Sequence, residues 1–350
     1  MRLLAGLSAR QLRKRGSREP GSSENGDGLL LHANISAASP ALPPLKGSRI
    51  MTPLIPVIDI APLRVGDDVN RAETAAAMGK ACRETGFFYI TGHGVAPETV
   101  AALFAAARAF FSQPSAAKDR LAMYRVGRNR GYVGLGVERL DTTALPDRKE
   151  AFNISPAEPG ADAWPDLPGW RALMIRHFET CLDLGAALHR GFARDLGVAE
   201  DFFADKFRNP MATLRLLRYP APSGAETVAP GAGAHTDYGN VTILVVNGVS
   251  GLQVRPRGGD WMDAPLIPGT FICNIGDCLM RWSNDVYVST PHWVLRPAAE
   301  RYAIAFFLDP DADALVEPIV SLAGDNPHYP PVTGYDYLQE RLNATYNHRS

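Results

Sequence analysis

The spacing of apolar residues changes near position 210. Before that point apolar residues recur every three or four positions, as on one face of a helix. In the longest such segment Trp170, Met174, Phe178 and Leu188 share a stripe, which predicts core packing rather than a cofactor site. Helices are predicted over residues 70–85, 97–112, 169–195, 199–206 and, past the change of period, 334–346.

After residue 210 the apolar runs become short and are separated by Gly, Pro and Asn-Asp turns. Strands are predicted over 212–219, 240–246, 251–255, 270–275, 286–289, 293–296 and 301–308. Three further strands are expected upstream, in PVIDI, in FFYITGHGV and around Phe152 and Asn153. Many short strands with such turns are typical of a sandwich or a barrel.

Composition narrows the function classes. The chain has 350 residues and a net charge of −1, so there is no electrostatic argument for a nucleic-acid partner. Its apolar runs are too short to span a bilayer. The four cysteines lack C-x-x-C spacing, which favours buried free thiols in a reducing cytoplasm. We therefore expect a cytoplasmic protein with a small-molecule substrate and no nucleic-acid or membrane partner, monomeric, with a homodimer as the alternative.

Residues 1–50 differ from the rest of the chain. Residues 1–18 are basic and contain no acid before Glu19, and a polar, Gly/Ser-rich stretch follows. Such a start mimics an organellar transit peptide. A disordered tail, or a start-site over-extension with the true start at Met51, is the preferred interpretation.

Candidate chemistry concentrates around His235 and Asp237, which follow a glycine-rich turn. On an extended backbone side chains two positions apart share a face, so these two point together. Two histidines and one carboxylate form the ligand set of non-haem Fe(II) oxygenases. His292, at the end of the run VYVSTPH, is the best candidate for the third ligand. Arg301 opens an apolar strand, where its planar fork suits a carboxylate.

Each of these residues also has a purely structural interpretation. Either histidine alone could be a structural core residue, Asp237 could cap a turn, and Arg301 could pair with a core acid such as Asp277. His93, in the turn GHGV, is expected to be satisfied by backbone. Asn274 and Asp277 are assigned to a turn between strands and are left out of the site.

The order of the motifs adds a resemblance. The set His235, Asp237, His292 and Arg301, flanked by YPAP, GLQV, NIGD and STPH, resembles the Fe(II)/2-oxoglutarate-dependent dioxygenases of the isopenicillin N synthase-like group. Upstream, IPVIDIAPL, GFFYITGHGV, RGYVGLGVE and KEAFNI resemble the same family, so the resemblance covers roughly residues 53–346. It implies a mainly β fold with flanking helices, a double-stranded β-helix (jelly roll) core after an N-terminal α/β region. The regions implied are 53–180 for the N-terminal part and 181–346 for the core.

The resemblance also implies cofactors and roles. His235, Asp237 and His292 would hold Fe(II), Arg301 and Tyr219 would bind the co-substrate 2-oxoglutarate, and O2 would be the oxidant. The enzyme would hydroxylate or desaturate a small organic molecule and release succinate and CO2. Independently of the resemblance, the glycine-rich loop 127–138, with Arg130 and Tyr132, is expected at the substrate entrance.

Three positions depart from the family pattern. Ala303 replaces the serine of Arg-x-Ser, which removes a hydroxyl donor to the co-substrate. Trp293 follows the distal histidine where arginine is common, and Leu217 stands where plant members carry asparagine. Alternatives therefore stay open: an ethylene- and succinate-forming or isopenicillin N synthase-like oxidase of the same fold, or a zinc-binding or non-catalytic barrel.

Overall fold

The computed structural model describes residues 55–126, 129–141, 143–155, 164–222 and 229–346. The expected tail or over-extension at 1–50 lies outside these residues. Among the helices of the described ranges, none combines the length and apolar character needed to cross a membrane.

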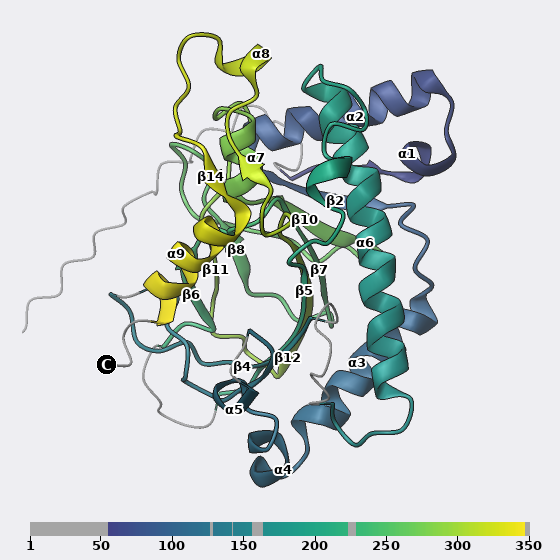
Figure 1. The fold of residues 1–350 in the computed structure, drawn as a ribbon. Helices are drawn as coiled ribbons and strands as arrows, with labels where there is room; N and C mark the ends of the chain where they lie inside the picture. The colour runs from purple at the N-terminus through teal and green to yellow at the C-terminus, as the bar shows by residue number, and fades with distance from the viewer. Residues whose placement is uncertain (1–54, 127–128, 142, 156–163, 223–228, 347–350) are drawn as a thin grey trace, which may run out of the picture. The chain divides into compact units, whose positions relative to one another are not determined.

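Two sheets form the core of the described chain (Figure 1). The large sheet has eight strands and is antiparallel except for the pairing of its edge strand β1 with β2. In spatial order it contains β1 (Val57–Asp59), β2 (Phe87–Thr91), β10 (Phe271–Ile275), β7 (Val241–Val246), β12 (Arg301–Leu308), β5 (Thr213–Tyr219), β4 (Glu150–Ile154) and β3 (Gly131–Val133). The small sheet contains β6 (Ala232–His235), β11 (His292–Val294), β8 (Leu252–Val254) and β9 (Met262–Asp263). A separate pair joins β13 (Leu315–Val316) to β14 (Val332–Thr333).

Helices cover the outer side of the large sheet. Figure 1 shows α2 (Asp68–Glu84), α3 (Pro97–Phe111) and α6 (Trp170–Asp195) along that side, with the small sheet and α9 (Gly334–Tyr346) on the other. Pro97 opens α3, where its missing N–H costs no hydrogen bond. The shorter helices are α1 (Ala61–Val65), α4 (Ser115–Asp119), α5 (Met123–Val126), α7 (Asp277–Trp282) and α8 (Val320–Ala323), with a 3-10 turn at Ala204–Lys206.

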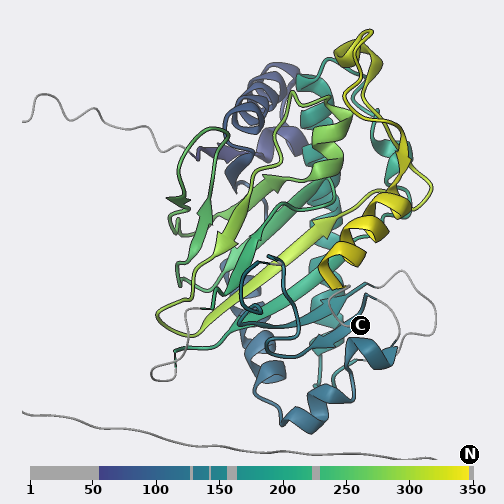
Figure 2. The ribbon, with the colours of Figure 1, turned by 90° about the vertical axis from the view of Figure 1, so that its left-hand side faces the viewer.

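Strand β12 shows how the alternation of side chains builds two cores. Ile304 and Phe306 point to the helices and join the larger core, whereas Ala303 and Ala305 point to the small sheet and join the second core. Both faces are buried, so the strand is apolar from Ala303 to Leu308 and carries its one charge at Arg301. Figure 2 shows β12 as one of the long strands of the large sheet.

Most predicted elements are confirmed, three predicted features differ, and some short elements, such as strand β6, are not predicted. Residues 286–289 form no strand, because the backbone N–H of Val288 bonds to Cys82 at the end of α2 rather than to a neighbouring strand. The NIGD segment leads into helix α7 instead of a simple turn. Strand β6 is not among the predicted strands, since Gly and Ala give no strand signal. The helix expected over 199–206 is reduced to the 3-10 turn.

Two smaller predictions are confirmed. All four cysteines are free and buried. His93 is satisfied by backbone: its Nδ1 accepts a hydrogen bond from the N–H of Val95, and its Nε2 lies 3.2 Å from the carbonyl oxygen of Gly269.

Candidate active site

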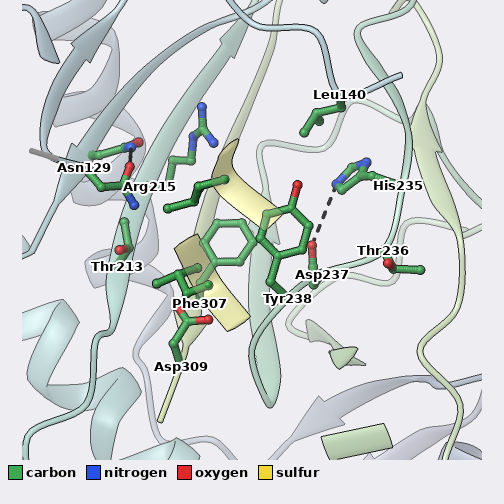
Figure 3. A pocket seen from close by; sticks show the side chains of 13 residues that line it. Asn129, Leu140, Thr213, Arg215, His235, Thr236, Asp237, Tyr238, Phe307 and Asp309 are labelled. Atoms are coloured by element: carbon green, nitrogen blue, oxygen red, sulfur yellow. Dashed lines mark hydrogen bonds and ion pairs between the residues drawn. The ribbon is translucent and has the colours of Figure 1, made fainter. Parts of the chain in front are cut away.

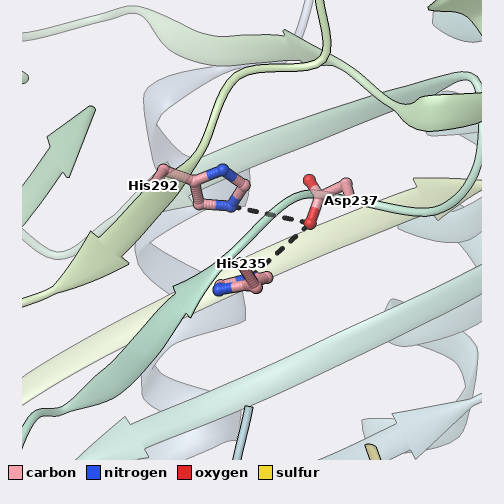
Figure 4. Close-up of side chains that lie close together, drawn as sticks. All are labelled: His235, Asp237 and His292. Carbon is pink, nitrogen blue, oxygen red and sulfur yellow. Dashed lines mark ion pairs between the residues drawn. The ribbon is translucent and has the colours of Figure 1, made fainter. Parts of the chain in front are cut away.

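His235, Asp237 and His292 converge between the sheets (Figure 4). Oδ1 of Asp237 lies 3.7 Å from Nε2 of His235 and 3.6 Å from Nε2 of His292. One ligand atom from each residue falls within 4.8 Å of the others, which is the spacing of a three-ligand metal site. The structure thus brings together the three residues that the sequence singles out.

Strand register explains why the two histidines meet. His235 ends β6 and His292 begins β11, and the two residues are directly opposite each other in the antiparallel ladder. Opposite residues of such a pair lie on the same face of the sheet. The sequence predicts His292 at the end of a strand, but it is the first residue of one.

The backbone fixes the orientation of both imidazoles. Nδ1 of His235 lies 2.7 Å from the carbonyl oxygen of Gly233, and Nδ1 of His292 lies 3.1 Å from that of Thr290. A carbonyl oxygen accepts only from a protonated nitrogen, so each Nδ1 carries a hydrogen, and in the neutral ring Nε2 then keeps its lone pair. Both lone pairs face Asp237, as metal-ligating histidines require.

Asp237 is held by its second oxygen. Oδ2 accepts hydrogen bonds from the hydroxyl of Thr242 and from Nδ2 of Asn274, the latter at 2.7 Å. Oδ1 is left facing the histidines. From sequence alone Asn274 is assigned to a turn, and Thr242 does not stand out. Both contacts depend on the positions of β7 and β10 beside the site, which the motif alone does not reveal.

Burial and mutual contacts set the charges of the three residues. Burial and the neighbouring His292 lower the pKa of His235 to about 3, so it is neutral near neutral pH. Burial alone would lower the pKa of His292, but the Asp237 carboxylate outweighs it and raises this pKa. Burial alone would raise the pKa of Asp237, but the His292 imidazole and the hydrogen bonds outweigh it, so this carboxyl stays ionised.

The NIGD segment anchors the loop that carries Asp237. A Cβ on Gly276 would lie 2.2 Å from the carbonyl oxygen of Gly239, so only glycine allows this close approach. The next residue, Asp277, donates its backbone N–H to the carbonyl oxygen of Asp237. Its carboxylate accepts from the Tyr337 hydroxyl at 2.9 Å and pairs with Arg341, which ties α9 to this loop. Asp277 is therefore engaged with α9 and is not the partner of Arg301.

Arg301 lies in the large sheet directly opposite Tyr219. Its guanidinium carbon is 4.8 Å from the centre of the Tyr219 ring, and its Nε donates to the carbonyl oxygen of Val249 at 3.2 Å. The residue is 1% exposed, and its Nη1 has no hydrogen-bond partner in the described part of the chain. Burial lowers the pKa of Arg301. A buried guanidinium with an unused donor is a site prepared for an anion.

Two cavities meet at the candidate metal site. The first lies between the sheets and is lined by the three converging residues, by Arg301 and Tyr219, and by apolar side chains that include Leu217 and Ala303. The second (Figure 3) is lined by His235 and Asp237 on one side and extends to Asp309 and α9. The donor set and the buried, unpaired Nη1 both fit Fe(II) with a dicarboxylate co-substrate.

Three residues singled out from the sequence lie away from the two cavities. Trp293 points away from the site, where it stacks on Trp261 and donates to Gln253. Tyr132 is buried in β3 and donates to Glu150, and Arg130 lies over the ring of Trp164. Neither lines the two cavities. From the glycine-rich loop it is Asn129 that faces the second cavity.

Comparisons with known families match both parts of the chain. Residues 55–172 match the model of the non-haem dioxygenase in morphine synthesis N-terminal region, and residues 211–310 match that of the 2OG-Fe(II) oxygenase superfamily. Among curated proteins, a homoarginine-6-hydroxylase of Arabidopsis thaliana is 35% identical over 76% of this chain and 87% of its own length. A 2-oxoglutarate-Fe(II) type oxidoreductase of Emericella nidulans is 31% identical over 83% of this chain and 90% of its own length.

Comparisons with solved structures point to the same superfamily. A full-length Neurospora crassa protein, solved in complex with alpha-KG and thymine, superposes with a TM-score of 0.77 at 32% identity, covering 83% of this chain and 96% of its own. JOX2, solved with 2OG, Fe and JA, gives a TM-score of 0.71 at 32% identity, covering 82% of this chain and 84% of JOX2. These relatives share the jelly-roll core, so the predicted fold class is confirmed. Fe(II) and 2-oxoglutarate are the cofactors of the group. The chain belongs to the 2OG-Fe(II) oxygenase superfamily and is a 2-oxoglutarate-dependent dioxygenase of small molecules.

Proposed function

We propose that His235, Asp237 and His292 are the Fe(II) ligands and that Arg301 and Tyr219 bind 2-oxoglutarate. The observation that carries this proposal is the shared cavity. Three ligand atoms within 4.8 Å of one another and a buried guanidinium with an unused Nη1 line the same space between the sheets. A 2-oxo dicarboxylate that chelates iron by one end needs a metal for that end and a cation for its distal carboxylate, and this cavity offers both.

When bound, Fe(II) and 2-oxoglutarate supply the oxidising chemistry: substrate, 2-oxoglutarate and O2 give oxidised substrate, succinate and CO2. The chain's own residues hold and orient the reactants. The imidazoles present their Nε2 atoms to the site, and Asp237 stays ionised because the His292 imidazole and the hydrogen bonds to its second oxygen favour the charged form. Apolar side chains such as Leu217 and Ala303 exclude water from the first cavity.

The substrate is proposed to occupy the second cavity. This cavity touches His235 and Asp237 but not Arg301, so a molecule there would approach the metal from a side that the co-substrate leaves open. Relatives act on or bind different small molecules, including homoarginine and thymine. We propose division of the chain into an N-terminal region over 53–180, which supplies Asn129 and Asn153 to this cavity, and a jelly-roll core over 181–346.

The test is coupled turnover with a matched set of variants. The parent protein, reconstituted with Fe(II), should consume O2 and release succinate in a 2-oxoglutarate-dependent manner, and a panel of small molecules should stimulate it. His235→Ala, Asp237→Ala and His292→Ala should each lose Fe(II) binding and turnover while keeping the melting transition.

His328→Ala is the matched control, because His328 is an exposed histidine that pairs with Asp285 away from the site. Stoichiometric iron in any of the three site variants would remove that residue from the ligand set. Turnover supported by zinc, or 2-oxoglutarate converted to products other than succinate, would favour the alternative activities.

A further inference from the structure

The second cavity contains a carboxylate that the proposed chemistry does not use. Asp309 is the residue just past the end of β12 and lines this cavity together with Tyr238, Leu338 and Leu342 (Figure 3). The same cavity is thus lined by an aromatic ring and by apolar side chains of α9. An acid in such a wall needs a partner, because a buried charge without one is strongly unfavourable.

Asp309 has no such partner in the described chain. It is 7% exposed, and no hydrogen bond or ion pair joins its carboxylate to another described residue. A Cβ on Gly239 would lie 2.5 Å from Oδ1 of Asp309, so this glycine makes room for the carboxylate without offering it a side-chain donor. Burial, together with the charge of Asp237, raises the pKa of Asp309 to about 7.

A second unsatisfied acceptor lies in the same wall. Asn153, on β4, is 2% exposed and donates its Nδ2 to Asn129 at 2.9 Å. Its Oδ1 has no partner among the described residues. The cation that also lines this cavity, Arg215, is engaged by both carboxylate oxygens of Glu138, at 2.5 and 2.6 Å. The wall thus presents hydrogen-bond acceptors, and the positive charge of Arg215 is already paired with Glu138.

The geometry of β12 separates this acid from the co-substrate site. Arg301, Ala303, Ala305 and Phe307 line the first cavity from one face of the strand, and Asp309 continues that alternation into the second. At ~3.3 Å per residue, roughly 20 Å of strand separates Arg301 from Phe307. A cation and an anion therefore stand at opposite ends of one strand, with the candidate metal site between them.

We propose that Asp309 is a specificity-determining residue that binds a cationic nitrogen group of the substrate, a guanidinium or an ammonium. The proposal rests on the proposed function, because it assigns the second cavity to the substrate. The cation would donate its N–H groups to Asp309, and the free Oδ1 of Asn153 would accept from another donor of the substrate. The aliphatic part of the substrate would pack between Phe307 and Leu338, with a C–H bond directed to the metal site.

The test compares two ligands of the same shape. L-homoarginine carries a guanidinium, and L-homocitrulline carries a neutral urea in its place. Affinities are measured by titration calorimetry on protein loaded with Mn(II) and 2-oxoglutarate, so no turnover occurs. L-lysine serves as the ammonium probe and distinguishes the two cations.

The parent should prefer at least one cationic probe to the neutral one. Asp309→Asn should weaken that cationic probe by roughly 10- to 100-fold, the effect of losing a hydrogen bond to a charged group. It should leave L-homocitrulline within about threefold. Asp263→Asn is the matched control, because Asp263 is an exposed acid on β9 that lies outside both cavities.

Several outcomes would overturn the assignment. A parent that binds neither L-homoarginine nor L-lysine, or that binds the neutral analogue as tightly, has no cation site. Equal weakening of charged and neutral probes in Asp309→Asn would indicate a purely structural role. If the parent fails to bind 2-oxoglutarate, that result contradicts the proposed function and not the cation site.

Discussion

Replacement of Arg301 by methionine removes a buried positive charge and keeps most of the side-chain volume. In the parent, Arg301 is 1% exposed, and Nη1 makes no hydrogen bond to the described chain. If the distal carboxylate of 2-oxoglutarate binds there, it leaves water and requires this cation. Loss of one partner of a buried, hydrogen-bonded charge pair costs about 2–5 kcal/mol. At ~1.4 kcal/mol per tenfold, 2-oxoglutarate should bind roughly 30- to several-thousand-fold more weakly.

The same substitution should not destabilise the ligand-free protein. Burial lowers the pKa of Arg301, which means that the fold tolerates the charge rather than gaining from it. Arg301→Met should thus keep or increase stability without ligand and lose the stability that 2-oxoglutarate adds. At a concentration 100 times the parent dissociation constant, the ligand adds about 2.7 kcal/mol to the parent. A variant weakened ~30-fold would gain less than about 1 kcal/mol.

The assay is anaerobic titration of the Fe(II) protein with 2-oxoglutarate, followed by its metal-to-ligand absorption band, with denaturant melts beside it. Arg301→Lys should rescue binding only in part, since lysine keeps the charge but not the planar fork. Arg255→Ala is the control, because Arg255 is exposed and lies over the ring of Trp261 outside the cavity. Parent-like affinity in Arg301→Met would refute the co-substrate assignment, and so would a large loss of stability without ligand.

Three further predictions follow from the same cavities. Ala303→Ser returns a hydroxyl beside Arg301 and should tighten 2-oxoglutarate by roughly two- to tenfold; unchanged affinity would show that this position does not reach the co-substrate. Asn274→Ala removes a hydrogen bond to Asp237 and should weaken Fe(II) by ~10- to 100-fold in chelator competition, whereas a loss no larger than that of His328→Ala would exclude the contact. The pKa of Asp309 is raised from 3.8 to about 7, so its contribution to stability is lost as pH rises between those values. In metal-free protein, the free energy of unfolding of Asp309→Asn relative to the parent should therefore rise by about 2–3 kcal/mol as the pH is raised from 5 to 8. A difference in denaturant melts that does not change with pH would contradict the assigned pKa.

The parts of the fold with strong periodicity could be predicted from the sequence. Helix α6 is predicted over 169–195 and spans Trp170–Asp195, because a long apolar stripe leaves few alternatives. Strand β12 is predicted over 301–308 and spans Arg301–Leu308. Strand β6 is not predicted, since its Gly- and Ala-rich residues form a strand only through pairing with β11. Segment 286–289 differs for the opposite reason: its residues favour a strand, but the backbone N–H of Val288 bonds to Cys82 near the end of α2 instead of to a strand.

The candidate site likewise contains residues that the sequence reveals and residues that it does not. The residues of the His-Thr-Asp and distal His motifs can be found from sequence because their types and order carry chemical information. Thr242 and Asn274 cannot, because their contacts with Asp237 depend on how β7 and β10 are placed beside the loop. Asp309 could have been found from sequence: it continues the alternation that begins at Arg301, and an acid at that phase must face the same interior.

That alternation explains how one strand can serve two molecules. The face of β12 that carries Ile304 and Phe306 is committed to packing against the helices, so its residues set stability. The other face borders the two cavities and carries the charges, Arg301 at one end and Asp309 just past the other. Since the proposed metal ligands come from the small sheet and its following loop, neither charge needs to contact the metal. Co-substrate and substrate recognition can then change independently, by single substitutions at opposite ends of the strand, while the iron site and the core stay as they are.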